Sequence, residues 1–434
     1  MRFNLWFAAI QPVSRWFETS SARRARWHLR ILFLMGLFAF GNEPECHAAA
    51  SGPPPPRPLT SHYWTGAISS TYSDTSNWEN GLPNTGDVLS MYDDHGLVGD
   101  LFLDSSVTVE ALVYSSTRST LISGALLHIA ATASSSTIDY GQLTIQSDIQ
   151  FGASQPAAEF QVNDTGTLIL AGNVDNNGST FTLKESLNGS GGASFFVSGV
   201  IEGSGGLTIH GTSTGLSSFS LSGQNTYTGA TTLTGSHAVL TLNGSIASSS
   251  LTTVNTGFTL KGTGTVGPLV LNSGAIISPG NSPGTLNAGN TTWEGGAQYV
   301  WEINQAANSA GADPGWDHLN ITGSLTINAT SENKFQIDLT SLTLGNVSGT
   351  VHDFNSSQSY TWTIATASDG ISGFDPSKFT LNSDDFLNAL NGGSFALSQN
   401  GNNLNLTFTP VPEPEEYALA AGIGLLGFAV WRRR

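Results

Sequence analysis

Short runs of β-forming residues, each followed by a glycine or asparagine turn, recur along most of this chain and constrain its fold more than any other feature. Between Val107 and Pro283 they come roughly every 10 to 13 residues, as in Leu143–Ile145 and Val239–Leu242. No helical stretch long enough for a βαβ crossover separates them. Parallel strands need a crossover, and a chain without helices supplies one only by coiling. The sequence therefore predicts an all-β fold, a parallel β-solenoid (β-helix) over residues 61–284.

Past Gly284 the alternation of apolar and polar positions becomes longer. Tyr299, Trp301 and Ile303 alternate with polar residues, and similar sets follow up to residue 408. Half-buried strands of this kind predict a C-terminal antiparallel β region over residues 285–410 that closes the solenoid. One short helix is also expected, with Ser383 as its N-cap, Gly392 after its end, and Phe386, Leu387 and Leu390 facing inward.

The charge balance excludes one class of function. The body between Ser51 and Pro410 carries 6 basic and 26 acidic residues, a formal charge of −20. Such a surface repels phosphate backbones, so no nucleic acid is expected as a partner. The chain also contains 50 Gly, which makes a disordered matrix protein an alternative. The 39% of hydrophobic residues, arranged with period 2, favours packed β-structure instead.

Residues 1–50 have the composition of a secretory signal peptide. Five arginines between residues 15 and 30 precede an apolar run over residues 31–40, and Ala48 and Ala50 supply the small residues of a cleavage site. A start-transfer anchor that is never cleaved is the alternative. The only cysteine, Cys46, lies inside this segment, so no cysteine metal site is expected in the mature chain. The proline-rich residues 51–60 predict an extended linker.

The last residues of the chain combine four elements in order. Val411 and Pro412-Glu413-Pro414 come first, followed by Tyr417, by an apolar run of 15 residues that ends at Trp431, and by three arginines. The run predicts a C-terminal transmembrane helix, although about 20 residues are needed to span a bilayer and the arginine side chains would have to snorkel. A buried helix of a soluble protein is the alternative. The expected anchor residues are Tyr417, Leu419, Gly422, Leu425, Leu426, Phe428 and Trp431, and the expected cytoplasmic stop is Arg432, Arg433 and Arg434.

Residues 411–434 together resemble the PEP-CTERM sorting signal of bacteria. The resemblance implies that an exosortase-type membrane protease cuts near Pro412-Glu413-Pro414 after a transient stay in the inner membrane. It also implies delivery to the cell surface or extracellular matrix of a Gram-negative-type bacterium, with exopolysaccharide as a further candidate partner. The resemblance concerns where the protein goes and covers about 24 residues of the chain.

A second resemblance lies within the predicted solenoid. Gly203 to Ile209, followed by Asn225-Thr-Tyr227-Thr-Gly229, is similar to the autotransporter-associated β-strand repeat, a rung of exported bacterial proteins. The stretch from Gly274 to Leu286 resembles the segment that often follows the last such repeat. Trp64 and Trp78 stand in a pattern that resembles the opening of secreted bacterial repeat proteins. They are expected to cap the end of the β-structure rather than to stack on sugars.

Two stretches of this chain match catalytic or cofactor-binding motifs, but neither has the neighbouring residues that the motif requires. Ser282 in Gly280-Asn-Ser-Pro-Gly284 matches a hydrolase nucleophile, but Pro283 has no N–H to donate to an oxyanion hole. The glycines of residues 262–267 match a dinucleotide fingerprint, but Pro268 and another strand follow where a helix must begin. No catalytic residue, cofactor or metal is therefore expected.

Two acidic groups keep a carbohydrate-active enzyme open as an alternative. Asp93-Asp94 with His95, or Asp313 with Asp317 and His318, could be imagined as a glycosidase pair, but solvated turn residues are the favoured interpretation. A lyase for acidic polymers needs a basic groove, and the six cations of the body are dispersed. An autotransporter-like adhesin is a further alternative. The favoured function is an exported, non-enzymatic β-solenoid protein of the bacterial cell surface or exopolysaccharide matrix.

Overall fold

The computed structural model describes residues 60–411 except 96–98, 157, 164, 187–190 and 213–214. Within this part the regular elements are β-strands and three short 3-10 helices, η1 (Thr75–Asn77), η2 (Asp93–His95) and η3 (Pro376–Lys378). The predicted signal segment and nearly all of the predicted membrane tail lie outside the described residues.

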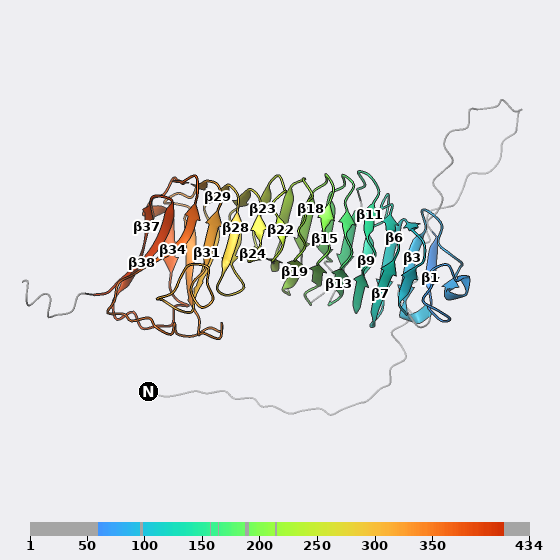
Figure 1. Cartoon of the computed structure of the whole chain (residues 1–434), viewed down its shortest axis with the longest axis horizontal. Helices are drawn as coiled ribbons and strands as arrows, with labels where there is room; N and C mark the ends of the chain where they lie inside the picture. Colours follow the sequence, from blue (N-terminus) through green and yellow to red (C-terminus); the bar gives the residue numbers. More distant parts are fainter. Residues whose placement is uncertain are drawn as a thin grey trace, which may run out of the picture. The chain divides into compact units, whose positions relative to one another are not determined.

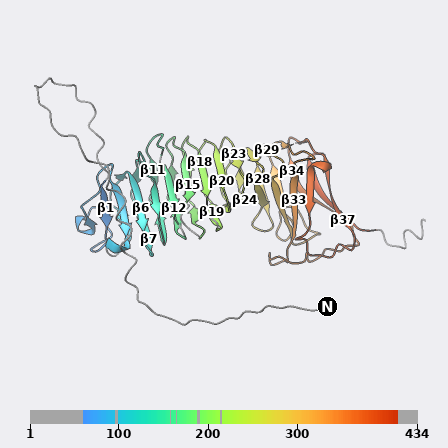
Figure 2. The same ribbon diagram turned by 180° about the vertical axis from the view of Figure 1, so that it is seen from behind.

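The strands form a parallel β-solenoid, as the sequence predicts. Most turns place one strand in each of three sheets, and successive turns pair in parallel with the turn before. Figures 1 and 2 show this stack from opposite sides, with the strands lying side by side from β1 to β37.

The first sheet has 14 strands and runs through the whole solenoid. In spatial order its strands are β2 (Trp78–Glu79), β1 (Ser61–Trp64), β3 (Val88–Tyr92), β6 (Ala111–Ser115), β9 (Ser136–Ile138), β12 (Glu159–Val162), β15 (Phe181–Glu185), β18 (Leu207–Gly211), β20 (Thr231–Gly235), β23 (Thr252–Val254), β26 (Leu269–Leu271), β29 (Thr291–Trp293), β32 (Leu325–Ile327) and β35 (Ile371–Ser372).

The second sheet has 12 strands. They are β36 (Phe379–Asn382), β33 (Phe335–Ser341), β30 (Gln298–Ile303), β27 (Ile276–Pro279), β24 (Phe258–Gly262), β21 (Ala238–Leu242), β19 (Ser217–Leu221), β16 (Ser194–Val197), β13 (Thr167–Leu170), β10 (Gln142–Ile145), β7 (Ser119–Gly124) and β4 (Leu101–Leu103).

The third side of the solenoid is divided into two sheets of 5 and 7 strands. The first contains β17 (Ile201–Glu202), β14 (Val174–Asp175), β11 (Ile149–Phe151), β8 (Leu127–Ile129) and β5 (Val107–Val109). The second contains β22 (Ser245–Ile246), β25 (Thr265–Val266), β28 (Thr285–Ala288), β31 (His318–Ile321), β34 (Tyr360–Ala367), β38 (Asn403–Thr409) and β37 (Ser394–Asn400).

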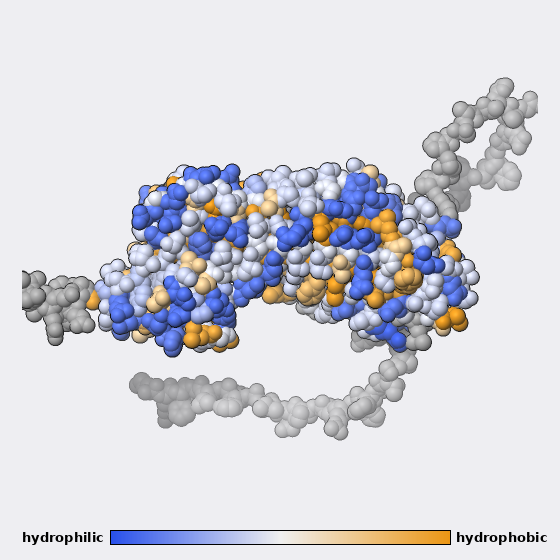
Figure 3. Space-filling view, viewed as in Figure 1, coloured by the Kyte–Doolittle hydropathy of each residue, from blue (hydrophilic) through white to orange (hydrophobic). Residues whose placement is uncertain are grey.

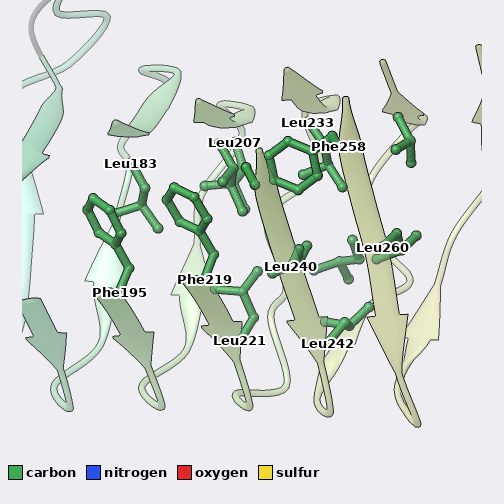
Figure 4. Close-up of a cluster of buried hydrophobic side chains, with 14 of the residues drawn as sticks. Leu183, Phe195, Leu207, Phe219, Leu221, Leu233, Leu240, Leu242, Phe258 and Leu260 are labelled. Carbon is green, nitrogen blue, oxygen red and sulfur yellow. The ribbon is translucent and has the colours of Figure 1, made fainter. Parts of the chain in front are cut away.

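The core is built from in-register columns of inward side chains. Alternate residues of each strand point inward, so a period-2 sequence places its apolar set inside and its Thr and Ser set outside. One column of the second sheet continues unbroken over ten strands, and Figure 4 shows its middle part. Its members are Leu143, Leu168, Phe195, Phe219, Leu240, Leu260, Ile277, Tyr299, Ile337 and Leu381.

The repeat-like motif lies where the third side is divided, between β17 and β22. Asn225 takes the place of a strand there: its Oδ1 accepts from the Ile201 N–H at 2.8 Å, and its Nδ2 donates to the Ser245 carbonyl at 3.0 Å. Tyr227 is fully buried, and its hydroxyl lies 2.6 Å from Thr231 Oγ1. The asparagine thus joins the turn before to the turn after, and the tyrosine fills the core beneath it.

The N-terminal end of the solenoid is capped by aromatic residues. Trp64 and Trp78 are buried and pack edge to face, with ring centroids 5.1 Å apart. Their indole N–H groups donate to backbone carbonyls, Trp64 to Gly99 at 3.0 Å and Trp78 to Tyr72 at 2.8 Å. Neither ring face is free to stack on a sugar, and the prediction that these tryptophans cap the β-structure is confirmed.

Antiparallel pairing is less extensive than expected for residues 285–410. Parallel pairing continues past Gly284 through β31 to β34, β32 to β35 and β33 to β36. Among the described residues, antiparallel ladders other than that of β1 with β2 join only β34, β38 and β37. An outward face that meets solvent gives the same alternation in a parallel solenoid, so the alternation does not distinguish the two arrangements.

The prediction of a short helix between Ser383 and Gly392 is wrong. This segment has no helix, and Leu387 is 51% exposed rather than inward. Bonds to other parts of the chain compete with helical ones: the Leu387 N–H donates to Ser341 Oγ at 2.7 Å, and the Asn388 side chain pairs with the backbone of Val351. These tertiary bonds override the local helix signal.

Candidate functional site

The sorting and membrane residues predicted from the sequence lie outside the described residues, with Val411 as the exception. Val411 is 51% exposed and follows the end of β38 at Thr409. Its side chain is therefore not part of the solenoid core. The part of the chain that the structure describes contains no helix long and apolar enough to cross a membrane.

Ser282 does not sit in the geometry of a hydrolase nucleophile. Its hydroxyl donates to the Glu302 carboxylate at 2.5 Å. After Pro283 and Gly284 the chain enters strand β28, not the helix that a nucleophile elbow requires. The turn instead connects β27 to β28.

The acidic residues Asp313 and Asp317 hold a loop in place. Asp317 is fully buried; its carboxylate accepts from the Gly284 N–H at 2.8 Å and from the Glu302 N–H at 3.0 Å. Burial, and next the nearby Glu302 charge, raise the pKa of Asp317 well above its usual value. Asp313 accepts from Asn304 and Asn346, both at 2.8 Å. The carboxyl group of Asp317 is thus closed off from solvent, and both oxygens of Asp313 accept from asparagine side chains.

His318 does not join Asp317 in a metal site. It is the residue after Asp317, at the start of β31, so the two side chains point to opposite faces of the strand. Its Nε2 lies 3.1 Å from Thr366 Oγ1, and burial lowers its pKa. Among the described residues there is no group of three or more His, Cys, Asp or Glu side chains placed to hold a metal ion.

Asp93 and Asp94, the other acids singled out in the sequence, line a surface pocket of about 250 Å³. Its other walls are Tyr92, residues 115–117 and Tyr140. We call this the tyrosine pocket. The ends of β3 and β6 and the turn after β9 supply its residues, so three successive turns of the solenoid contribute to it.

Hydrogen bonds fix Asp93 in the tyrosine pocket. Its Oδ1 accepts from Ser116 Oγ at 2.6 Å, and its Oδ2 accepts from the Thr117 N–H at 2.8 Å and Thr117 Oγ1 at 3.0 Å. These bonds, with a smaller contribution from the Arg118 charge, hold the pKa of Asp93 below its usual value. Asp93 is therefore an ionised acceptor and not a general acid.

The two tyrosines of the pocket differ in exposure. Tyr92 is half-buried and packs edge to face on Tyr63, with centroids 5.8 Å apart. Burial, and then the charges of Asp139, Tyr63 and Asp94, raise the pKa of Tyr92. Tyr140 is 48% exposed, so about half of its side chain surface is accessible to solvent. Sequence reasoning singled out neither tyrosine. Tyr92 directly precedes Asp93 in the sequence, whereas Tyr140 reaches the acids from another turn of the solenoid.

A smaller pocket of about 160 Å³ lies on the outer face of β11, β14 and β17. Its acids include Asp148, which accepts from the Asn173 N–H at 2.8 Å, and Asp175, which accepts from Gln150 Nε2 at 2.9 Å. No aromatic ring lines it.

On the face seen in Figure 3, hydrophobic residues form small patches among hydrophilic ones.

The described cations do not form a basic groove. Arg118 lies 4.0 Å from Asp93, Lys184 lies 3.8 Å from Glu159, and Lys378 donates to the Gly373 carbonyl at 2.8 Å. Each belongs to a different turn of the solenoid, as do Lys261 and Lys334. The arrangement does not suit binding of an acidic polymer.

No protein-family model and no curated protein sequence matches this chain.

Proposed function

We propose that this chain is an exported, non-enzymatic β-solenoid protein of the bacterial cell surface or exopolysaccharide matrix. A cleavable signal over residues 1–50 starts its export. An exosortase-type protease then cuts the tail near Pro412-Glu413-Pro414, after the tail has anchored the chain transiently in the inner membrane.

One observation carries this proposal: the sorting motif begins where the folded solenoid ends. Strand β38 closes the fold at Thr409, and the motif starts at Val411. A protease could cut there without removing any strand of the scaffold. A scaffold role is supported by the continuous columns of buried apolar side chains, which run from turn to turn along the body.

A glycosidase on the same scaffold is less well supported. That chemistry needs one carboxyl group with a raised pKa, accessible to substrate, beside a second carboxylate. Asp93 faces a pocket, but its pKa is lowered. Asp317 has a raised pKa, but it is fully buried.

Replacing Arg432, Arg433 and Arg434 with serine is expected to prevent normal processing of the tail. Each arginine costs about 2.5–3.5 kcal/mol to move to the bilayer centre, so the three together hold the C-terminus in the cytoplasm. Cell fractionation and immunoblotting should show the serine variant uncut in the membrane or released into the medium.

The triple lysine variant at the same positions is the matched control. It keeps the three positive charges and should be sorted and cut like the wild type. If the serine variant were also processed and delivered normally, the arginines would not be the cytoplasmic stop.

A further inference from the structure

The tyrosine pocket has the features of a site for a sugar ring. It combines one half-exposed aromatic side chain, one fixed carboxylate and several hydroxyl groups in a cavity of about 250 Å³. Binding sites for small polar molecules characteristically pair an apolar wall with a few precisely placed polar groups. We propose that this pocket binds one ring of an uncharged polysaccharide, stacked against Tyr140.

The polar side of the pocket is organised before any ligand binds. Asp93 makes three bonds to Ser116 and Thr117, so its carboxylate keeps a fixed position at the pocket wall. Ser116 itself is almost fully buried, so its hydroxyl donates to Asp93 from within the packed turn. A preorganised acceptor costs little entropy when a sugar hydroxyl donates to it.

The aromatic side is also organised. Tyr92 packs edge to face on Tyr63 and forms one wall, whereas Tyr140, in the turn after β9, is about half exposed. Aromatic rings present a large apolar face, and Tyr adds a hydroxyl that can reach water or ligand. The apolar face of a pyranose ring fits such a surface.

The charge around the pocket selects the class of sugar. Asp93 and Asp94 line it, and the charge of Asp139 also acts on Tyr92. Arg118 is the nearby cation; its guanidinium lies 4.0 Å from Asp93 and its side chain is 55% exposed. This acidic surrounding disfavours uronic acids and sulfated sugars, so an uncharged polysaccharide is the ligand that fits.

This inference rests on the proposed location in a polysaccharide matrix, and gel electrophoresis of the full-length chain in mild detergent tests it. Native gels are cast with a neutral β-glucan, with dextran, or with anionic alginate. The chain carries a formal charge of −17 and migrates by that charge. Tyrosine and phenylalanine substitutions leave the charge unchanged, so a difference in retardation reports binding.

A neutral polysaccharide should retard the wild type, and Tyr140→Ala should weaken that affinity by about tenfold or more. Tyr140→Phe keeps the ring and should bind within about twofold of the wild type. Phe196→Ala is the matched control, because Phe196 is 44% exposed on β16, outside the pocket. It should leave retardation unchanged.

The proposal would be overturned if neither neutral polysaccharide retarded the chain, whether or not alginate did, or if Tyr140→Ala and the wild type were retarded equally. Either result, found with a tail that is still cut, would remove the sugar site and leave the sorting proposal standing. If the polysaccharides retarded the chain as expected but the tail stayed uncut, the sugar site would stand and the sorting proposal would fall.

Discussion

Phe219→Ala should lower the free energy of unfolding by about 3–5 kcal/mol. Phe219 is fully buried, and its ring stacks on Phe195 with centroids 4.6 Å apart and planes 10° from parallel. Truncation removes the buried surface and leaves a cavity between two turns that backbone pairing holds at a fixed spacing. Chemical denaturation followed by tryptophan fluorescence would measure the loss.

The matched control is Ser220→Ala on the same strand. Ser220 is the next residue of β19 and points outward, so its truncation should change stability by no more than about 0.5 kcal/mol. Equal denaturation curves for Phe219→Ala and Ser220→Ala would contradict the inward column that Figure 4 shows.

Gly229→Ala should cost about 1–3 kcal/mol, because the turn at Gly229 lies directly against the turn before it. The Gly229 N–H donates to the Gly205 carbonyl at 3.0 Å. A Cβ at Gly229 would overlap the carbonyl group of Gly205 and the nitrogen of Gly206. These are backbone atoms of a paired turn, so they cannot rotate away as a side chain could.

Gly345→Ala is the control for the loss of a glycine as such. A Cβ there would meet only the Thr343 hydroxyl, at 3.8 Å, which is ordinary contact. Its denaturation midpoint should match that of the wild type. An unchanged midpoint for Gly229→Ala as well would mean that successive turns do not approach closely at this corner.

The solenoid could be predicted because the alternation of inward and outward residues is visible within each short strand. A run such as Val239–Leu242 shows its own inward and outward faces, and the absence of helices leaves coiling as the crossover. The extent of antiparallel pairing could not be predicted from Tyr299, Trp301 and Ile303, whose alternation fits either direction. The prediction of a helix after Ser383 is wrong because the competing bonds go to Ser341 and Val351, which lie 46 and 37 residues away in the sequence and are not visible in a local pattern.

The tyrosine pocket was only partly visible in the sequence. Asp93 and Asp94 stand out as adjacent acids, but Tyr140 lies in a different turn of the solenoid, 47 residues after Asp93. Which residues of successive turns meet depends on the length of each turn, and turn lengths vary along this chain. If the alignment of successive turns had been known, Tyr140 beside the corner glycine Gly141 would have marked the pocket.

Intact mass spectrometry of the protein recovered from the cell surface tests the central claim most directly. If the chain is exported and cut as proposed, the recovered form begins near Ser51 and ends close to Glu413, and its mass is lower than that of the precursor by both terminal segments. Recovery of a surface form that still carries residues 417–434 would make the tail a permanent membrane anchor and would contradict the sorting function.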